Sequence, residues 1–372
     1  MFVAGLDAHT RYVVVAILDR FGEPLVQPTR VRTEQPTRLL ELLAPYRPLE
    51  VVMETSSSWP WLQDLLSGAG IRFVLAHARR LRAIAEANYK RDEIDATLLA
   101  RMRLAGCIPA VYATPATQRE WATLIRHRTA LVQHRTMVAN RLHAQLHTCG
   151  LSLERGRLLT RNGRRWLRKE AWPVFSPEQR AVVRSHLGMI AGLRPLIRAL
   201  DRRIAQVAAP IAEAQWLMSI PGIGPHRALL ICAEVLPISR FPTPNHLASY
   251  AGLVPTSSQS GLRPIHHGPI PRGANRWLRG ALVRAVVSHV QHCPESWLTA
   301  YYVKHKARVG WPVARVATAR KLVRAIHAML RTGTTWRIQA TQATQATQAT
   351  DRTDPAPGEL VPQHAAHDGL TQ

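Results

Sequence analysis

The sequence predicts an α/β domain followed by a longer, mostly helical region. Within residues 1–110, short apolar runs typical of strands alternate with amphipathic stretches typical of helices. From residue 111 on, apolar residues recur mainly at helical spacing, interrupted by Gly- and Pro-containing loops. With 372 residues, the chain is long enough for two or three domains with their own cores.

The N-terminal elements follow one another in an order that predicts a mixed sheet flanked by helices. Residues 2–7, 12–18 and 25–32 read as three strands, with a turn at "DRFGEP" between the second and the third. The first two strands are expected to form an antiparallel hairpin. The elements expected next are a helix near 36–46, a strand at 50–54, a helix near 59–68, a strand at 72–76, and helices near 78–88 and 92–105. The resulting order, β-β-β-α-β-α-β-α, is typical of α/β domains.

Two long helices are expected next. Residues 115–148 carry Leu124, Leu131 and Val138 at intervals of seven. A second stretch has apolar residues spaced alternately by three and four, as in a coiled coil: Ile190, Leu193, Ile197, Leu200, Ile204, Val207 and Ile211. Pro195 marks either the start of this helix or a kink in it. The pattern suits an intramolecular helical hairpin and a dimerising coiled coil equally well.

The remainder divides into a folded region and a tail. Residues 216–335 look mostly helical, and the tail contains the repeat "TQATQATQATQAT" with little apolar content, which predicts disorder. The expected domains are an α/β domain at 1–110, a helical coiled-coil region at 111–213, a C-terminal domain at 214–335 and a disordered tail at 336–372.

Positive charge is concentrated in the helical region. Residues 1–106 hold 14 Lys/Arg and 12 Asp/Glu, whereas residues 107–335 hold 33 and 8, and residues 336–372 hold 2 and 4. Such a field attracts phosphate backbones and speeds association with them. The preference for Arg over Lys could follow from a GC-rich genome, but that bias does not explain the excess of basic over acidic residues.

The sequence also indicates where the protein works. No apolar run approaches the roughly 20 residues of a membrane-spanning helix, and Asp7, His9 and Arg11 interrupt the apolar N-terminus, so it is not a signal peptide. The four cysteines lie far apart without a CxxC pair, which argues against a zinc ribbon or a disulfide framework. We expect a cytoplasmic bacterial protein, associated with the nucleoid and not with a membrane.

Four acidic residues are candidates for a metal site. Asp7 lies in the first strand ("AGLDAHT"), Glu54 ends the fourth ("VVMETSSSW"), and Asp92 and Asp95 begin a helix ("KRDEIDATLLA"). Strand ends in α/β sheets are where sites form, and Mg²⁺ ions would neutralise the repulsion between the carboxylates. Each acid has a simpler explanation, such as a helix cap for Asp92 or a solvated side chain for Asp95. Together, in this order, they indicate an RNase H-like nuclease fold.

Two glycine-containing stretches in the C-terminal domain suit phosphate chemistry. "MSIPGIGPHRALLICAEV" reads as helix, tight turn and helix, a helix-hairpin-helix-like arrangement that can direct backbone N–H groups at a phosphate. Farther on, "TSSQSG" holds three serines ahead of a basic helix, and a serine hydroxyl can attack phosphorus. The first stretch is explained equally well as a simple helix–helix connection, and Ser-Gly loops such as the second are usually only loops. The residues expected to contact nucleic acid are Gly222, Gly224, Arg272, Arg276 and Arg279.

In these motifs the chain resembles the DEDD transposases of the insertion sequence 110 family, the bridge-RNA-guided serine recombinases. The motifs that carry the resemblance are "GLDAHT", "METSSSW", "KRDEIDATLLA", "SIPGIG", "LASYAGLVP" and "SQSG…GPIPRGANRWLRGAL", in order over residues 3–330. The resemblance implies a RuvC-like N-terminal domain, a coiled-coil insert and a C-terminal transposase domain that holds the nucleophile.

The resemblance also implies roles for individual residues. Asp7, Glu54, Asp92 and Asp95 would hold Mg²⁺ as a catalytic tetrad, and Ser260, immediately before a glycine, would be the nucleophile. Ser257 and Ser258 are fallbacks, because relatives often have Ser-Ser-Gly where this chain has Gln-Ser-Gly; relatives also often have glycine where this chain has Ser57. The implied partners are DNA (element ends and target), a non-coding guide RNA, and further copies of the chain in a dimer or tetramer.

Three functions therefore compete. The leading hypothesis is a transposase that cleaves and exchanges DNA strands through a covalent phosphoserine intermediate. A RuvC-like, structure-specific nuclease would use water in place of the serine. A catalytically inactive nucleic-acid-binding protein is disfavoured by the complete set of acids.

Overall fold

The computed structural model describes residues 1–84, 92–154, 156–258, 266–268, 270–271 and 273–336. The chain divides into two compact units, one from Met1 to Thr123 and one from Leu124 onward. The predicted tail lies outside the described residues from residue 337 on. Its predicted first residue, Trp336, belongs to the folded part, because its indole stacks on Trp297 with ring centroids 5.7 Å apart.

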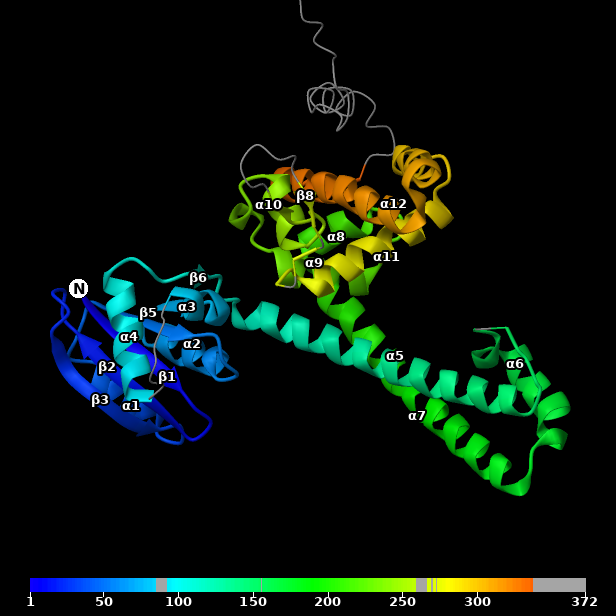
Figure 1. Cartoon of the computed structure of the whole chain (residues 1–372), viewed down its shortest axis with the longest axis horizontal. Helices are drawn as coiled ribbons and strands as arrows, with labels where there is room; N and C mark the ends of the chain where they lie inside the picture. Colours follow the sequence, from blue (N-terminus) through cyan, green and yellow to red (C-terminus); the bar gives the residue numbers. More distant parts are fainter. Residues whose placement is uncertain (85–91, 155, 259–265, 269, 272, 337–372) are drawn as a thin grey trace, which may run out of the picture. The chain divides into compact units, whose positions relative to one another are not determined.

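The first unit is built on the mixed sheet that the sequence predicts (Figure 1). Strand β1 (Phe2–Ala8) is central, antiparallel to β2 (Tyr12–Leu18) and parallel to β4 (Leu49–Glu54). The outer strands are β3 (Pro24–Arg32), antiparallel to β2, and β5 (Arg72–Ala76), parallel to β4. The short strand β6 (Ala110–Val111), which the sequence did not predict, pairs antiparallel with β5. The order is β3-β2-β1-β4-β5-β6.

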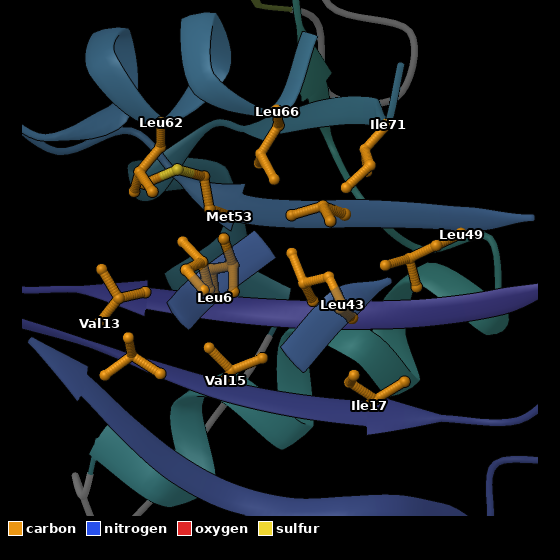
Figure 2. Close-up of a cluster of buried hydrophobic side chains, with 14 of the residues drawn as sticks. Leu6, Val13, Val15, Ile17, Leu43, Leu49, Met53, Leu62, Leu66 and Ile71 are labelled. Atoms are coloured by element: carbon orange, nitrogen blue, oxygen red, sulfur yellow. The ribbon is translucent and has the colours of Figure 1, made fainter. Parts of the chain in front are cut away.

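Strand alternation sends apolar side chains to both faces of this sheet. On one face, Leu6, Val15 and Met53 pack under α1 (Pro36–Leu43) and α2 (Trp59–Gly68), as Figure 2 shows. On the other face, Val3 and Val52 pack against α4 (Asp92–Leu104), with Leu81 of α3 (Ala78–Ile84) in the same cluster. A sheet covered on both faces explains why the central strands read as near-continuous apolar runs.

Helix α4 lies directly on the sheet because β1 has no side chain at Gly5. A Cβ atom added there would lie 1.8 Å from the backbone oxygen of Ala96. At the other end of the helix, Arg103 Nε donates to Oε1 of the buried Glu50 at 2.7 Å. The close contact and the ion pair together fix where each turn of α4 sits on β1 and β4.

The second unit begins with a pair of long helices. Helix α5 (Ala116–Thr148) crosses from the first unit into the second, and α7 (Pro177–Ala208) follows α6 (Arg161–Trp166) and two short turns. Val138 and Leu142 of α5 share one buried cluster with Val183 and Ile190 of α7. The helices therefore pack within one chain, in agreement with the helical-hairpin interpretation.

The predicted heptad positions locate the buried side of α7, whereas the alternative in which Pro195 starts the helix is wrong. Ile190, Ile197 and Ile204 are buried at intervals of seven. The helix begins at Pro177, where Ser176 forms a capping box with Gln179, so Pro195 lies inside the helix and does not start it. Ile211 lies beyond the end of α7, as the residue that precedes α8.

The C-terminal part of the second unit is a helical bundle with one small hairpin, as predicted in outline. The helices are α8 (Ala212–Met218), α9 (Pro225–Val235), α10 (Pro244–Tyr250), α11 (Arg276–His292) and α12 (Trp297–Thr332). Between α10 and α11, β7 (Ser257–Ser258) pairs with β8 (His266–His267). Helix α12 is interrupted at Gly310, whose φ is +76°. None of the described helices is both long and apolar enough to cross a bilayer.

Replacing Gly5 with alanine should destabilise the first unit. The new methyl group would overlap the α4 backbone, and such overpacking costs roughly 3 kcal/mol or more. Urea unfolding of the full chain measures the effect. Gly68→Ala is the matched control, because nothing lies within 4 Å of a Cβ at that helical position, so its unfolding free energy should stay level or rise. Equal stability of the two variants would show that α4 does not depend on the gap at Gly5.

Candidate active site

Asp7 and Glu54 stand side by side at the ends of neighbouring parallel strands. The register pairs Leu6 of β1 with Met53 of β4, so the next residue on each strand is one of these acids. In each strand, the residues that come just before the acid are buried. The predicted convergence of the two strand ends is thus what the sheet topology produces.

Both carboxylates belong to the face of the sheet that α4 covers. Asp7 pairs with Val14 across β1 and β2, and Val14 shares a small buried cluster with Ala96 of α4. Glu54 follows Val52 by two residues, and Val52 packs against the α4 side. The side chain of Asp7 remains about a quarter exposed, at 24%. The site is therefore at the rim of the core, open to a ligand.

The first turn of α4 supplies the other two predicted acids. Progressing from Ala96 to Met102, the helix passes from the Val14 end of the sheet towards Val3. Its N-terminal turn, with Asp92 and Asp95, therefore lies towards the strand ends where Asp7 and Glu54 stand. Asp95 is half-buried, whereas the side chain of Asp92 lies outside the described residues.

His9 is a member of this site that the sequence analysis did not single out. Its Nε2 donates to Oδ2 of Asp7 at 2.9 Å, and its ring lies 4.8 Å from that of Tyr12. The signal was the spacing in "DAH", because residues two apart along an extended strand face the same way. The hydrogen bond restricts the rotation of the Asp7 carboxylate.

The donor chemistry of these acids suits a hard divalent cation, which prefers carboxylate oxygens. Within the described part of the chain, however, no three acidic, His or Cys side chains lie close enough together to form a metal-binding cluster. Of the four predicted acids, Asp92 is the one whose side chain is not described. With it, the carboxylates at these strand ends would number four. The backbone arrangement is thus compatible with a metal site. The side chains of the described acids alone do not form one.

The predicted nucleophile follows the small strand β7 in the sequence. Ser257 pairs with His267 and Ser258 with His266, while Ser260 and its neighbours at 259–265 lie outside the described residues. The backbone N–H of Gly268 donates to the carbonyl of Thr256 at 2.7 Å, which extends the pairing beyond the strands. Ser260 thus lies between the two strands in the sequence, and its role as nucleophile stays a prediction.

A single asparagine ties together the two helices that flank this hairpin. Asn275 caps α11 by accepting from the backbone N–H groups of Trp277 and Leu278. Its Nδ2 donates to Oε2 of Glu234 at 2.7 Å and to the Tyr250 hydroxyl at 3.1 Å, and its backbone N–H donates to the Tyr250 carbonyl. The end of α10 and the start of α11 therefore meet at Asn275.

The Pro-Gly-Ile-Gly turn between α8 and α9 packs closely on α11. A Cβ at Gly222, where φ is +94°, would lie 2.8 Å from the backbone nitrogen of His289. The buried His289 donates from Nδ1 to the Pro221 carbonyl at 2.9 Å and accepts the Ser296 hydroxyl at Nε2, 2.6 Å away. Burial lowers the pKa of His289, so its ring is neutral in this role. Gly222 thus has a packing function, and its contact with phosphate stays a prediction.

The other predicted contact residues lie on or near the first turns of α9 and α11. Gly224 precedes α9, and its carbonyl accepts from the first turn of that helix. Arg276 is exposed, with its Cζ 6.0 Å from the ring of Trp277, and Arg279 is half-buried against the loop at Gly252. Arg272 lies outside the described residues.

Beside the start of α9, a histidine is surrounded by arginines. Burial, followed by the charge of Arg128, lowers the pKa of His226 to about 4, with Arg227 and Arg284 contributing and Asp201 opposing. Arg128 is itself paired with Asp201, with Nε 2.8 Å from Oδ1. His226 is therefore neutral at physiological pH, and the positive charge here belongs to arginines.

Comparisons with known proteins match two separate parts of the chain. A family model of a DEDD transposase domain of IS110 elements matches residues 4–150, and one described as "Transposase IS116/IS110/IS902 family" matches residues 214–303. A 43.6 kDa protein of insertion element IS110 from Streptomyces coelicolor is 34% identical over 154 residues, 41% of this chain and only 37% of that protein.

Two relatives match over nearly their whole length. The transposase for insertion sequence element IS1111A from Coxiella burnetii is 25% identical over 91% of this chain and 92% of its own. The transposase for IS1328 from Yersinia enterocolitica is 25% identical over 89% of this chain and 97% of its own.

His226 should make the second unit less stable as the pH falls from about 6.5 to about 4. The unfolded chain binds a proton at the histidine below pH 6.5, while the folded chain resists protonation until about pH 4. A tenfold change in proton affinity is worth about 1.4 kcal/mol, so the loss is at most about 3 kcal/mol. Urea unfolding at about pH 7 and about pH 4.5 should show a smaller loss for His226→Gln than for the unaltered chain. The same pH dependence in both would contradict this assignment.

Proposed function

This chain belongs to the IS110 family of transposases, and on that premise we propose that it cleaves and exchanges DNA strands for its insertion sequence through a Mg²⁺-dependent, covalent phosphoserine route. The observation that carries the proposal is that Asp7 and Glu54 occupy equivalent positions on adjacent parallel strands, on the side covered by the acidic first turn of α4. The first unit is on this proposal a RuvC-like nuclease domain.

The acids serve the metal in this proposal. Asp7, Glu54, Asp92 and Asp95 would hold Mg²⁺, which when bound supplies charge neutralisation at the scissile phosphate. The chain itself contributes the orientation of these side chains. His9 holds the Asp7 carboxylate at 2.9 Å, and the Gly5 contact and Glu50–Arg103 pair hold α4 in place.

The serine supplies the covalent step. Ser260 Oγ would form a bond to the scissile phosphorus while one bond between that phosphorus and a deoxyribose oxygen breaks. The serine loses its hydroxyl proton and the departing sugar oxygen gains one, so no oxidant or further reactant is needed. The phosphate bond energy is retained in the phosphoserine, which allows a second sugar hydroxyl to reverse the step and join a new strand.

The partners follow from the family and from charge. The proposed ligands are the element ends, the target DNA and a non-coding guide RNA, all of which carry phosphate that the basic region at 107–335 would attract. A homo-oligomer, dimer or tetramer, would let the acids of one copy work with the serine of another. Val182, Met189 and Leu196, which are about half exposed at intervals of seven along α7, support such self-association.

Trapping the covalent intermediate tests the proposal. Denatured full-length protein on labelled DNA should carry DNA on the peptide that contains Ser260, and Ser260→Ala should lose the adduct while still binding nucleic acid, because phosphate contacts dominate affinity. Ser257→Ala and Ser258→Ala are the matched controls and should keep the adduct. Asp7→Ala and Asp95→Ala should lose it without loss of the fold.

Mixing variants tests whether the site is composite. Ser260→Ala combined with Asp7→Ala protein should restore some adduct in mixed oligomers, which neither variant forms alone. An adduct on another residue would displace Ser260. Cleavage without an adduct in any variant would favour the hydrolytic nuclease, and no cleavage by the unaltered chain with its element DNA and RNA would favour an inactive binding protein.

Nucleic-acid binding should depend steeply on salt. Because the basic residues concentrate at 107–335, log K should fall linearly with log salt, by about 0.9 for each duplex phosphate contacted. A chain truncated after Trp336 should show the same slope, since it keeps this region and the packed indole. Fluorescence anisotropy measures both. Binding that hardly changes between low and physiological salt would reject the claim that this region contacts phosphate backbones.

A further inference from the structure

Residues of α6, of the turns beside it and of α7 line a pocket of about 450 Å³. Figure 1 shows where these elements lie, at one end of the pair of long helices. This volume is within the range of roughly 300–1,000 Å³ that is usual for small-ligand sites. Its walls are mainly apolar. The apolar residues that line it are Leu158, Leu159, Leu167, Trp172, Leu187 and Ile190. The pocket is more than 60 residues from the acids and from Ser260 in the chain, and the proposed chemistry does not use it.

Three arginines line the same pocket. Arg164 and Arg168 are exposed, Arg194 is half-buried, and none of the three forms an ion pair with a carboxylate of the described residues. The charge of Arg164 and then burial lower the pKa of Arg194, with Arg198 and Arg135 adding to the effect. Arg135 also has a buried Nε without a hydrogen-bond partner. The pocket is thus a site of unneutralised positive charge.

The surroundings contain little to neutralise this charge. Residues 157–198 hold ten Lys/Arg and two Asp/Glu. Guanidinium groups that repel one another cost free energy, which an anion seated among them would recover. A ligand that fits must therefore carry at least one negative charge beside an apolar body.

Trp172 adds an aromatic surface. Its ring lines the pocket, with the Cζ of Arg184 5.0 Å and that of Arg180 6.0 Å from the ring centroid. An aromatic ring, apolar walls and cations at the rim form the combination by which proteins hold single-stranded nucleic acid, where bases stack and phosphates meet cations. A base paired within a duplex cannot enter such a pocket.

We propose that this pocket binds one unpaired nucleotide of a single-stranded nucleic acid. The base lies among Leu167, Trp172 and Ile190, and its phosphate meets Arg164, Arg168 and Arg194. The inference rests on the proposed function only in the choice of nucleic acid as ligand. RNA and DNA share this chemistry, so the source is decided by experiment.

Site-specific crosslinking to the full chain tests the proposal. Oligonucleotides carrying one 5-iodouracil, which crosslinks to aromatic rings in contact with it, are prepared as single-stranded RNA, single-stranded DNA and the corresponding duplexes. The crosslinked peptide is identified by mass spectrometry. We expect crosslinks at Trp172 with single strands and not with duplexes, and the preferred strand identifies the source.

Two pairs of variants provide matched controls. Ala191→Phe fills the pocket, whereas Ala199→Phe adds the same group at an exposed α7 position outside it. Arg164→Gln with Arg168→Gln removes two charges at the pocket, and Arg202→Gln with Arg203→Gln removes two exposed ones farther along α7. The first member of each pair should reduce the Trp172 crosslink roughly tenfold, a size typical of losing one stacked base. The second member should leave it near the unaltered value. Circular dichroism checks that Ala191→Phe folds.

Several outcomes would overturn the inference. Equal crosslinking of duplexes would overturn it, as would crosslinks confined to peptides outside 158–194. An equal loss of the Trp172 crosslink in both members of a variant pair would also overturn it. Displacement of the oligonucleotide by an acidic, leucine-containing peptide at equal concentration would assign the pocket to a protein ligand. Because the readout is binding at Trp172, a chain that forms the Ser260 adduct but fails this test rejects only the pocket, and the reverse result rejects only the chemistry.

Discussion

The arrangement of the first unit depends on the contact between the backbone of α4 and β1 at Gly5. A helix normally rests on a sheet at a distance set by the side chains between them, but here one of those side chains is missing. The close approach brings the first turn of α4 to the strand ends where Asp7 and Glu54 stand. The ion pair between the buried Glu50 of β4 and Arg103 of α4 keeps the helix from shifting along the sheet. Breaking such a buried pair by removing one partner is strongly destabilising, because it leaves an uncompensated buried charge. The Glu50–Arg103 pair therefore matters for the position of α4 as much as for stability.

The two units differ in how their charges are handled. In the first unit acids and bases are nearly balanced, with 14 Lys/Arg and 12 Asp/Glu over residues 1–106. In the second, arginines outnumber acids, and some of them pair with carboxylates, as Arg128 does with Asp201 and Arg126 with Glu234. The three arginines that line the pocket beside α6 form no such ion pair with a described carboxylate. On the inference drawn above, the phosphate of a bound nucleotide would neutralise their charge.

Sequence periodicity predicted the sheet well because its strands are buried on both faces and follow one another closely in the chain. It missed β6, since two residues carry no detectable alternation, and it left open whether Pro195 starts α7 or lies within it, because proline is a strong breaker locally but the surrounding helix tolerates it. The acids at Asp7 and Glu54 were predictable from strand ends. His9 was missed although its spacing of two from Asp7 in "DAH" carried a signal, and the pocket beside α6 required the packing of three segments that no local pattern links. The placement of Ser260 and of the Asp92 side chain stays a prediction, as both lie outside the described residues.

Asn275 joins the end of α10 to the start of α11, and so fixes the two ends of the segment 251–274 that connects these helices. Since Tyr250 and the first turn of α11 are held by one side chain, the distance between the ends of this segment is set by the helices and not by the segment itself. The entropic cost of closing a loop grows only with the logarithm of its length, so residues can be added or removed between these anchors at small cost to folding. The link at Asn275 thus allows the length of the segment that contains Ser260 to be altered, by natural variation or by engineering, without redesigning the helices on either side.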